Sequence, residues 1–140
     1  MNKDIPMQTA TLRTVDVDGQ GHEFTVQGPL IRHPYAAFHV GPKDGSTDIQ
    51  FELTVDISEP SARVVLMNNQ GEPYYAKKGI AEAAILHAAT ALNMPVRSNT
   101  ATMDSPEGNA REPAATKVWQ RLVAQGKARY AAEQDVFQTT

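Results

Sequence analysis

The alternation of apolar and polar side chains between residues 48 and 58 limits most strongly how this chain can fold. Apolar residues occupy every second position for five cycles, at Ile49, Phe51, Leu53, Val55 and Ile57. Successive side chains of a strand point to opposite faces of a sheet, so this pattern predicts a strand with one buried and one wet face. Such a strand needs neighbouring strands and a layer that covers its apolar face.

The first half of the chain predicts further strands. Segments 9–17 and 22–27 flank an Asp-Gly-Gln-Gly turn and predict a first hairpin. The continuous apolar run Val64 to Met67 predicts a more central strand. Segment 28–42 contains three prolines, which limit any helix there to a turn or two, so its structure stays open between strand and helix.

After Gly71 the pattern becomes helical. Apolar spacing predicts a helix from Gly79 to Leu92 and a second from Pro113 to Gln125, separated by the short β-prone segment 94–99. The last residues, 127–140, can supply a final strand. These elements predict an α+β fold: a single domain, 1–140, with a mixed, mainly antiparallel sheet and two main helices.

Composition excludes several classes of function. The net charge of −3 provides no global field for nucleic acid, and the absence of cysteine rules out a disulfide framework and a thiolate metal site. The four histidines show no paired ligand spacing, so no metal site is predicted, and Ser98 and Ser105 have no matching hydrolase arrangement. No apolar run approaches the roughly 20 residues that span a bilayer, and the first residues lack a signal-peptide core. We therefore expect a soluble, cytoplasmic protein without nucleic-acid or membrane partners.

A doubly basic, glycine-bearing loop, Lys77-Lys78-Gly79, precedes the first predicted helix. Helix N-termini present unpaired N–H groups and a partial positive charge, so this loop can form an anion cradle. Two solvated lysines in an ordinary turn explain the same residues equally well. Tyr74 and Tyr75 lie beside the loop, where they can line a cleft or serve packing.

The order of elements from Ala62 to Gln138 resembles the C-terminal core of the GNAT N-acetyltransferase superfamily. The order is a strand (RVVLMNN), a basic glycine loop, a helix, the short strand MPVRSN, a second helix and a final strand. In that family a loop of the form Q/R-x-x-G-x-G/A follows the fourth strand. Residues 76–81 keep its G-x-A but not its Gln or Arg, and residues 1–61 are divergent N-terminal strands.

The resemblance implies an acetyl-CoA-dependent transfer of an acetyl group to an unidentified amine. It places the pantetheine arm along the strand that holds Val65 and Met67. It places the pyrophosphate on the loop and helix start formed by Lys77, Lys78, Gly79, Ile80 and Ala81. The variant Gly79→Val is expected to abolish CoA binding and leave the fold intact, because a Cβ would obstruct close approach of the pyrophosphate. The strands RVVLMN and MPVRSN are expected to lie parallel, side by side, and to splay at the end nearer Gly71.

Three departures from the family, at the loop Gln or Arg, at Trp119 and at Arg63, leave the catalytic residues unassigned. Trp119 stands where family members often carry a tyrosine acid, and an indole N–H does not ionise at neutral pH. Arg63 stands where a carboxylate base is often found, while Glu52 and Asp56 lie one strand earlier, on its polar face. Trp119 shares an apolar stripe with Leu122 and is predicted to belong to the core, and His87 to lie on a helix flank.

The same departures support other functions. A GNAT-like scaffold that has lost catalysis can act as a binding or inhibitory module on a protein partner, because a fold alone does not guarantee chemistry. A structural or assembly protein that uses the strand Asp48 to Ser58 as an exposed edge is a third alternative. The sequence leaves a homodimer open in each case.

Overall fold

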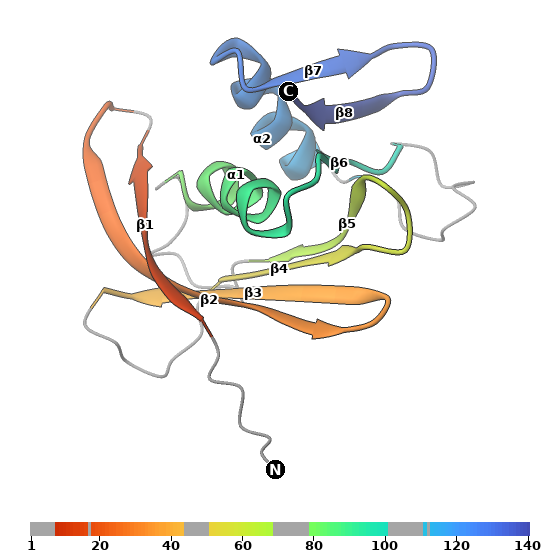
Figure 1. Cartoon of the computed structure of the whole chain (residues 1–140). Coiled ribbons are helices and arrows are strands. Elements are labelled where there is room, and N and C mark those ends of the chain that lie inside the picture. Colours follow the sequence, from red (N-terminus) through yellow and green to blue (C-terminus); the bar gives the residue numbers. More distant parts are fainter. Residues whose placement is uncertain (1–7, 17, 44–50, 69–78, 101–110, 112) are drawn as a thin grey trace.

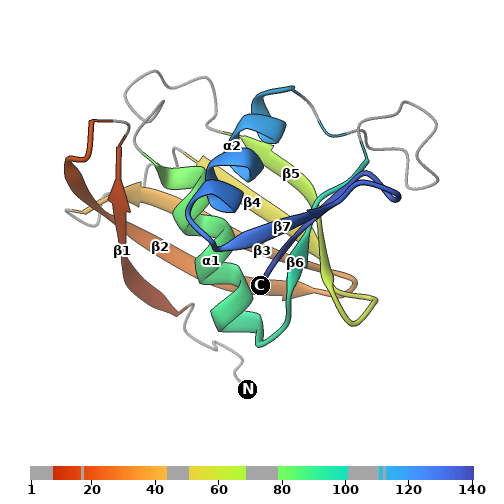
Figure 2. The ribbon, with the colours of Figure 1, turned by 90° about the horizontal axis from the view of Figure 1, so that it is seen from above.

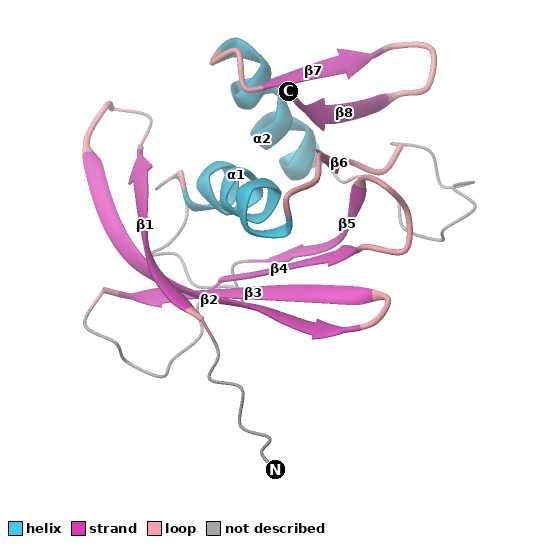
Figure 3. Ribbon diagram, in the orientation of Figure 1, coloured by secondary structure: helices cyan, strands magenta, loops and turns pink. Residues whose placement is uncertain are grey.

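The computed structural model describes residues 8–16, 18–43, 51–68, 79–100, 111 and 113–140. They form eight strands and two helices (Figures 1 and 3). The strands are β1 (Thr9–Val15), β2 (Gly21–Arg32), β3 (Tyr35–Pro42), β4 (Phe51–Asp56), β5 (Ala62–Asn68), β6 (Val96–Arg97), β7 (Ala128–Ala131) and β8 (Val136–Thr139). The helices are α1 (Ile80–Leu92) and α2 (Pro113–Ala124). All eight strands belong to one mixed sheet in the order β1-β2-β3-β4-β5-β6-β8-β7, so the α+β class is confirmed.

Strands β1 to β5 follow one another through antiparallel pairings. The alternation that predicted β4 is confirmed, because Phe51, Leu53 and Val55 are buried and the residues between them are half-buried. However, β4 pairs with β3 on one side and β5 on the other. The prediction that this strand serves as an exposed edge is therefore wrong for the part of it that the structure describes.

Segment 28–42, left open by the sequence, contributes the end of β2 and all of β3. Its Gly28-Pro29 pair lies where the β2–β3 register shifts, between Gln27 and Leu30. A β-bulge tolerates a residue that lacks a backbone N–H, which explains how a proline occurs inside a long strand.

The crossover from β5 through α1 to β6 has the predicted arrangement. β5 and β6 are adjacent and parallel, with Ala62 opposite Val96 and Arg63 opposite Arg97. The C-terminal segment forms a hairpin of two strands rather than one, and β8 lies between β6 and β7. The prediction of a single final strand is thus corrected.

The sheet curls around α1, which lies in its concavity with α2 beside it (Figures 1 and 2). The face of α1 that enters the core carries small residues, Ala84 and Ala88, next to Ile85, and all three are fully buried. Small side chains let a helix approach a sheet closely, as the alanine-rich sequence predicted. Trp119 of α2 is 1% exposed and stacks on Phe137 of β8, which confirms its place in the core.

The opposite face of β2, β3 and β4 is here called the outer face, and it carries Thr25, Gln27, His39, Glu52 and Thr54. These side chains alternate with the buried core residues of the same strands and are all half-buried. Neither of the two described helices has both the length and the apolarity to cross a bilayer.

Candidate functional site

The parallel strands β5 and β6 separate after two residue pairs. This separation is explained by hydrogen bonds between Ser98, which follows β6, and β8. The Ser98 N–H donates to the Phe137 carbonyl at 2.9 Å, and Ser98 Oγ accepts the Phe137 N–H at 2.9 Å. The chain after β6 therefore follows β8, while β5 continues to Asn68 alongside β4. The edge of β5 beyond Arg63 has no ladder partner among the described residues of β6.

A β-bulge in β5 lies beside this opening. Thr54 pairs with Leu66 but the next residue, Val55, pairs with Val64, so Val65 is an extra residue opposite the β4 ladder. Bulges bend a strand and re-aim its side chains, and they are enriched next to active sites. Val65, which the sequence assigned to the pantetheine contact, is thus the irregular residue of this strand, and Met67 packs partly against the core.

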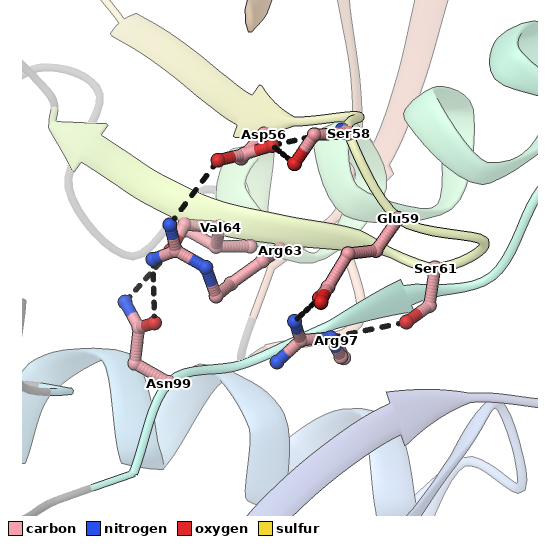
Figure 4. A network of polar contacts seen from close by, with 8 residues as sticks. All are labelled: Asp56, Ser58, Glu59, Ser61, Arg63, Val64, Arg97 and Asn99. Carbon is pink, nitrogen blue, oxygen red and sulfur yellow. Dashed lines mark hydrogen bonds and ion pairs between the residues drawn. The ribbon is translucent and has the colours of Figure 1, made fainter. Parts of the chain in front are cut away.

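Side chains close the narrow end of the opening (Figure 4). Asn99, which follows β6, donates from Nδ2 to the Val64 carbonyl at 2.7 Å. Arg63 donates from Nη1 to Asn99 Oδ1 at 3.0 Å and from Nη2 to Asp56 Oδ2 at 3.3 Å. Arg63 and Asn99 are each 8% exposed. Asn99 thus occupies one acceptor position of the Val64 carbonyl, and the edge of β5 beyond Val64 lies past this contact.

Asp56 acts in this network as a structural carboxylate. The Ser58 hydroxyl and the Ser58 N–H donate to it at 2.6 and 2.8 Å, and these bonds, followed by the Arg63 charge, lower the pKa of Asp56. In the same turn Arg97 donates to Ser61 at 3.0 Å and to Glu59 at 2.5 Å. A carboxylate held in its charged form by several donors is a poor proton acceptor, so Asp56 is poorly suited to act as a general base.

The N-terminus of α1 is closely packed against β1. Gly79 is its N-cap, with φ of 80° and no side-chain cap, and a Cβ built on it would lie 2.4 Å from the Val15 carbonyl oxygen. The sequence attributed this glycine to a close approach by pyrophosphate, but the backbone of β1 alone already requires it. The expectation that Gly79→Val leaves the fold intact is therefore wrong.

Two more polar groups belong to this end of α1. Glu82, in the first turn and 8% exposed, accepts a hydrogen bond from Arg121 Nε of α2 at 2.5 Å. Its negative charge complements the helix dipole but opposes a bound anion, and Arg121 offsets that opposition. Thr14 of β1 is 4% exposed, and its Oγ1 lacks a hydrogen-bond partner within the part of the chain that the structure describes.

The predicted cofactor residues that the structure describes lie on two elements. Val65 and Met67 lie on β5, and Gly79, Ile80 and Ala81 lie at the start of α1. The Ile80 side chain is 2% exposed in the core, so only its backbone is available to a ligand. The loop residues Tyr74, Tyr75, Lys77 and Lys78 lie outside the described residues, as does Ser105.

Sequence reasoning missed a histidine on the outer face. His39 of β3 lies opposite Glu52 of β4, with 3.9 Å between Nε2 and Oε2, and their side chains are 18% and 26% exposed. Thr54 donates its hydroxyl to Glu52 Oε2 at 3.1 Å. The β3–β4 register makes this pair, and no local sequence motif indicates it. The alternating sequence of β4 predicted that Glu52 lies on the polar face of the strand, but it did not show that β3 is the neighbouring strand.

A second histidine–carboxylate pair, Asp16 and His22, belongs to the β1–β2 turn. Asp16 Oδ2 lies 2.8 Å from His22 Nε2, while Oδ1 accepts the N–H groups of Asp18 and Gln20 at 2.9 Å. The contact with His22 and these backbone bonds lower the pKa of Asp16. The pair stabilises the hairpin, and β3 and β4 lie between that hairpin and β5 in the strand order of the sheet.

The β7–β8 hairpin is fastened to the rest of the fold by Arg111. Its side chain is 6% exposed and donates to Asp135 Oδ1 at 2.9 Å, to the Asn99 carbonyl at 2.9 Å and to Thr116 Oγ1 at 2.8 Å. A shallow pocket of about 360 Å³ lies between α2 and this hairpin, lined by Arg111, Thr116, Gln120, Val123, Tyr130 and Phe137. The bonds of Arg111 within the protein give it a structural role.

Comparison of this chain with known protein families, curated proteins and solved structures finds no match.

Proposed function

We propose that this protein is an acyl-CoA-dependent N-acyltransferase that transfers an acetyl group to an amine. One observation carries the proposal: the parallel strands β5 and β6 separate after two residue pairs, beside the bulge at Val65. In the chain, α1 follows β5 and connects these two strands. Such a site offers two kinds of contact to an extended ligand with an anionic end. The backbone groups of the strand edge that lie outside a ladder can pair with the extended part, and the helix N-terminus can bind the anion.

The residues present fit such a ligand in part. The β5 edge beyond Val64 can donate and accept main-chain hydrogen bonds, and the first N–H groups of α1 can face an anion. Glu82 reduces the positive potential at that helix end, and its ion pair with Arg121 limits the reduction. Bound acetyl-CoA would supply an activated thioester, and the protein would contribute mostly orientation of the two reactants.

Proton transfer cannot use Trp119. The indole is 1% exposed and stacked against Phe137, and its N–H does not ionise at neutral pH. Water or another side chain must therefore protonate the departing sulfur. Acetyl transfer is therefore expected to be slow, unless the acid and the base that catalyse it lie elsewhere on the sheet.

The test is thermal unfolding of the whole protein with acetyl-CoA and with CoA, followed by release of CoA thiol in the presence of amines. A ligand at 100 times its dissociation constant stabilises a protein by about 2.7 kcal/mol, which raises the melting temperature by several degrees. The double variant Lys77→Ala/Lys78→Ala is expected to weaken acetyl-CoA binding. Lys117→Ala, on the exposed side of α2, is the matched control and should leave binding unchanged. The absence of any shift with acetyl-CoA and CoA would refute the proposal.

A second candidate is a non-catalytic module with the same scaffold, which binds a protein partner. The observation that favours it is the closure of the opening by Arg63 and Asn99, combined with the burial of Trp119. Binding of acetyl-CoA without thiol release for polyamines, amino acids and lysine peptides would support this candidate and exclude the enzyme.

A further inference from the structure

The outer face of the sheet places a carboxylate one strand away, and a histidine two strands away, from the bulge in β5. One cross-strand row runs from Gln27 through His39 and Glu52 to Asn68. The neighbouring row joins Thr54 to Leu66, which directly follows the bulge residue Val65. Adjacent strands are about 4.8 Å apart, so Glu52 lies within one strand spacing of the segment of β5 that follows the bulge.

The environment of the pair suits a proton acceptor. Glu52 is oriented by the Thr54 hydroxyl, and its Oε2 faces Nε2 of His39. At 3.9 Å the separation of Nε2 and Oε2 is longer than a hydrogen bond, so the two groups do not share a proton. Since Nε2 faces the carboxylate, Nδ1 is the nitrogen left to accept a proton. Side-chain exposures of 18% and 26% leave both groups within reach of a ligand.

We propose that His39, positioned by Glu52, is the proton acceptor for a cationic primary amine that binds on the outer face beside the β5 bulge. This inference rests on the proposed N-acyltransferase function and identifies the site and charge of its acceptor. The β2 neighbour of His39 is the neutral Gln27, and its β4 neighbour is Glu52. A carboxylate in this position attracts an ammonium group and disfavours an anionic acceptor.

The step balances as follows. His39 Nδ1 takes one proton from the ammonium group, and the neutral nitrogen forms a bond to the acyl carbon while the carbon–sulfur bond breaks. The sulfur keeps the electron pair of that bond and receives the proton held by His39. The second proton leaves the new amide nitrogen for water, so one proton is released in each turnover.

Two readouts test the inference. The first is the NMR signal of the His39 ring, assigned by its loss in His39→Gln, during titration with 1,4-diaminobutane and with tetramethylammonium at constant ionic strength. We expect the diamine to shift this signal in wild type but not in Glu52→Gln. Tetramethylammonium has no N–H to donate and should produce little shift. An unmoved His39 signal would overturn the proposal without any reference to activity.

The second readout is the steady-state kinetics of CoA-thiol release. His39→Gln should lower kcat at neutral pH by about 100-fold, within the range for loss of a general base, and leave acetyl-CoA affinity unchanged. Glu52→Gln removes the carboxylate that attracts the ammonium group, so it should raise the KM for 1,4-diaminobutane more than it lowers kcat. His33→Gln and Glu133→Gln, both at exposed turns, are the matched controls.

The two hypotheses fail in different ways. If wild type binds acetyl-CoA and releases thiol while His39→Gln keeps the wild-type rate, the assignment of His39 is wrong and the proposed function stands. If wild type does not bind acetyl-CoA, the proposed function fails and this inference fails with it.

Discussion

Gly79 provides a quantitative test of the packing between α1 and β1. Its φ of 80° lies in the left-handed region, where a residue with a Cβ is strained by about 1–2 kcal/mol. In Gly79→Ala the Cβ would also lie 2.4 Å from the Val15 carbonyl oxygen, so α1 or β1 must move. Displacement of a packed backbone costs about a further 1–3 kcal/mol. We therefore expect Gly79→Ala to lower the free energy of unfolding by about 2–5 kcal/mol.

Gly19→Ala separates the two contributions. Gly19 has almost the same φ, 81°, but nothing lies within 4 Å of the position of its Cβ. This control should lose only the conformational part, about 1–2 kcal/mol. Urea unfolding followed by circular dichroism measures both variants, and with a slope of about 2 kcal/mol/M their midpoints should differ by about 0.5–1.5 M. Equal losses in the two variants would refute the contact between Gly79 and Val15.

Three further predictions concern polar side chains that are buried or half-buried. Thr14→Val should raise the free energy of unfolding, measured with urea, by up to about 1 kcal/mol, because it removes a buried hydroxyl without a described partner. A decrease of more than about 1 kcal/mol would show that the hydroxyl has a partner. Burial lowers the pKa of His87 below 6.5, so the unfolded chain binds the proton first and stability falls as the pH drops through 6.5. His87→Gln should flatten the pH dependence of the urea midpoint between pH 7 and 5, and an unchanged slope would contradict this. Arg111→Lys should lower the free energy of unfolding by about 2–4 kcal/mol in the same assay, because an ammonium group cannot reproduce the guanidinium contacts to Asp135 and Asn99. A decrease below about 0.5 kcal/mol would show that Arg111 does not hold the hairpin in place.

The candidate site shows why sequence reasoning reached only some of the relevant residues. The period of β4 placed Glu52 and Asp56 correctly on the wet face. It could not show that Asp56 is held in its charged form by Ser58, nor that Glu52 faces His39, because the sequence had not assigned the β3–β4 pairing. Register is decided by pairing between segments, and a local pattern carries no information about the partner.

The sequence alone determined those elements whose signal is local and periodic. The alternation around Leu53 and the helical spacing of α1 and α2 repeat within a few residues. The turn of the β1–β2 hairpin is likewise a signal carried by a few adjacent residues. A periodic set of apolar side chains can be buried in only one kind of element, so these features needed no tertiary information. The parallel pairing of β5 with β6 followed from their order along the chain around a helix.

The tertiary structure alone decided the features that depend on distant segments. Gly79 is required by the carbonyl of Val15, more than sixty positions away, and the separation of β5 from β6 is caused by the bonds of Ser98 to β8. The bulge at Val65, the hydrogen bond of Asn99 to Val64 and the His39–Glu52 pair exist only once the sheet has its register. The free energy of such contacts is set by positions in space, and the sheet brings those positions together from segments with no shared local pattern.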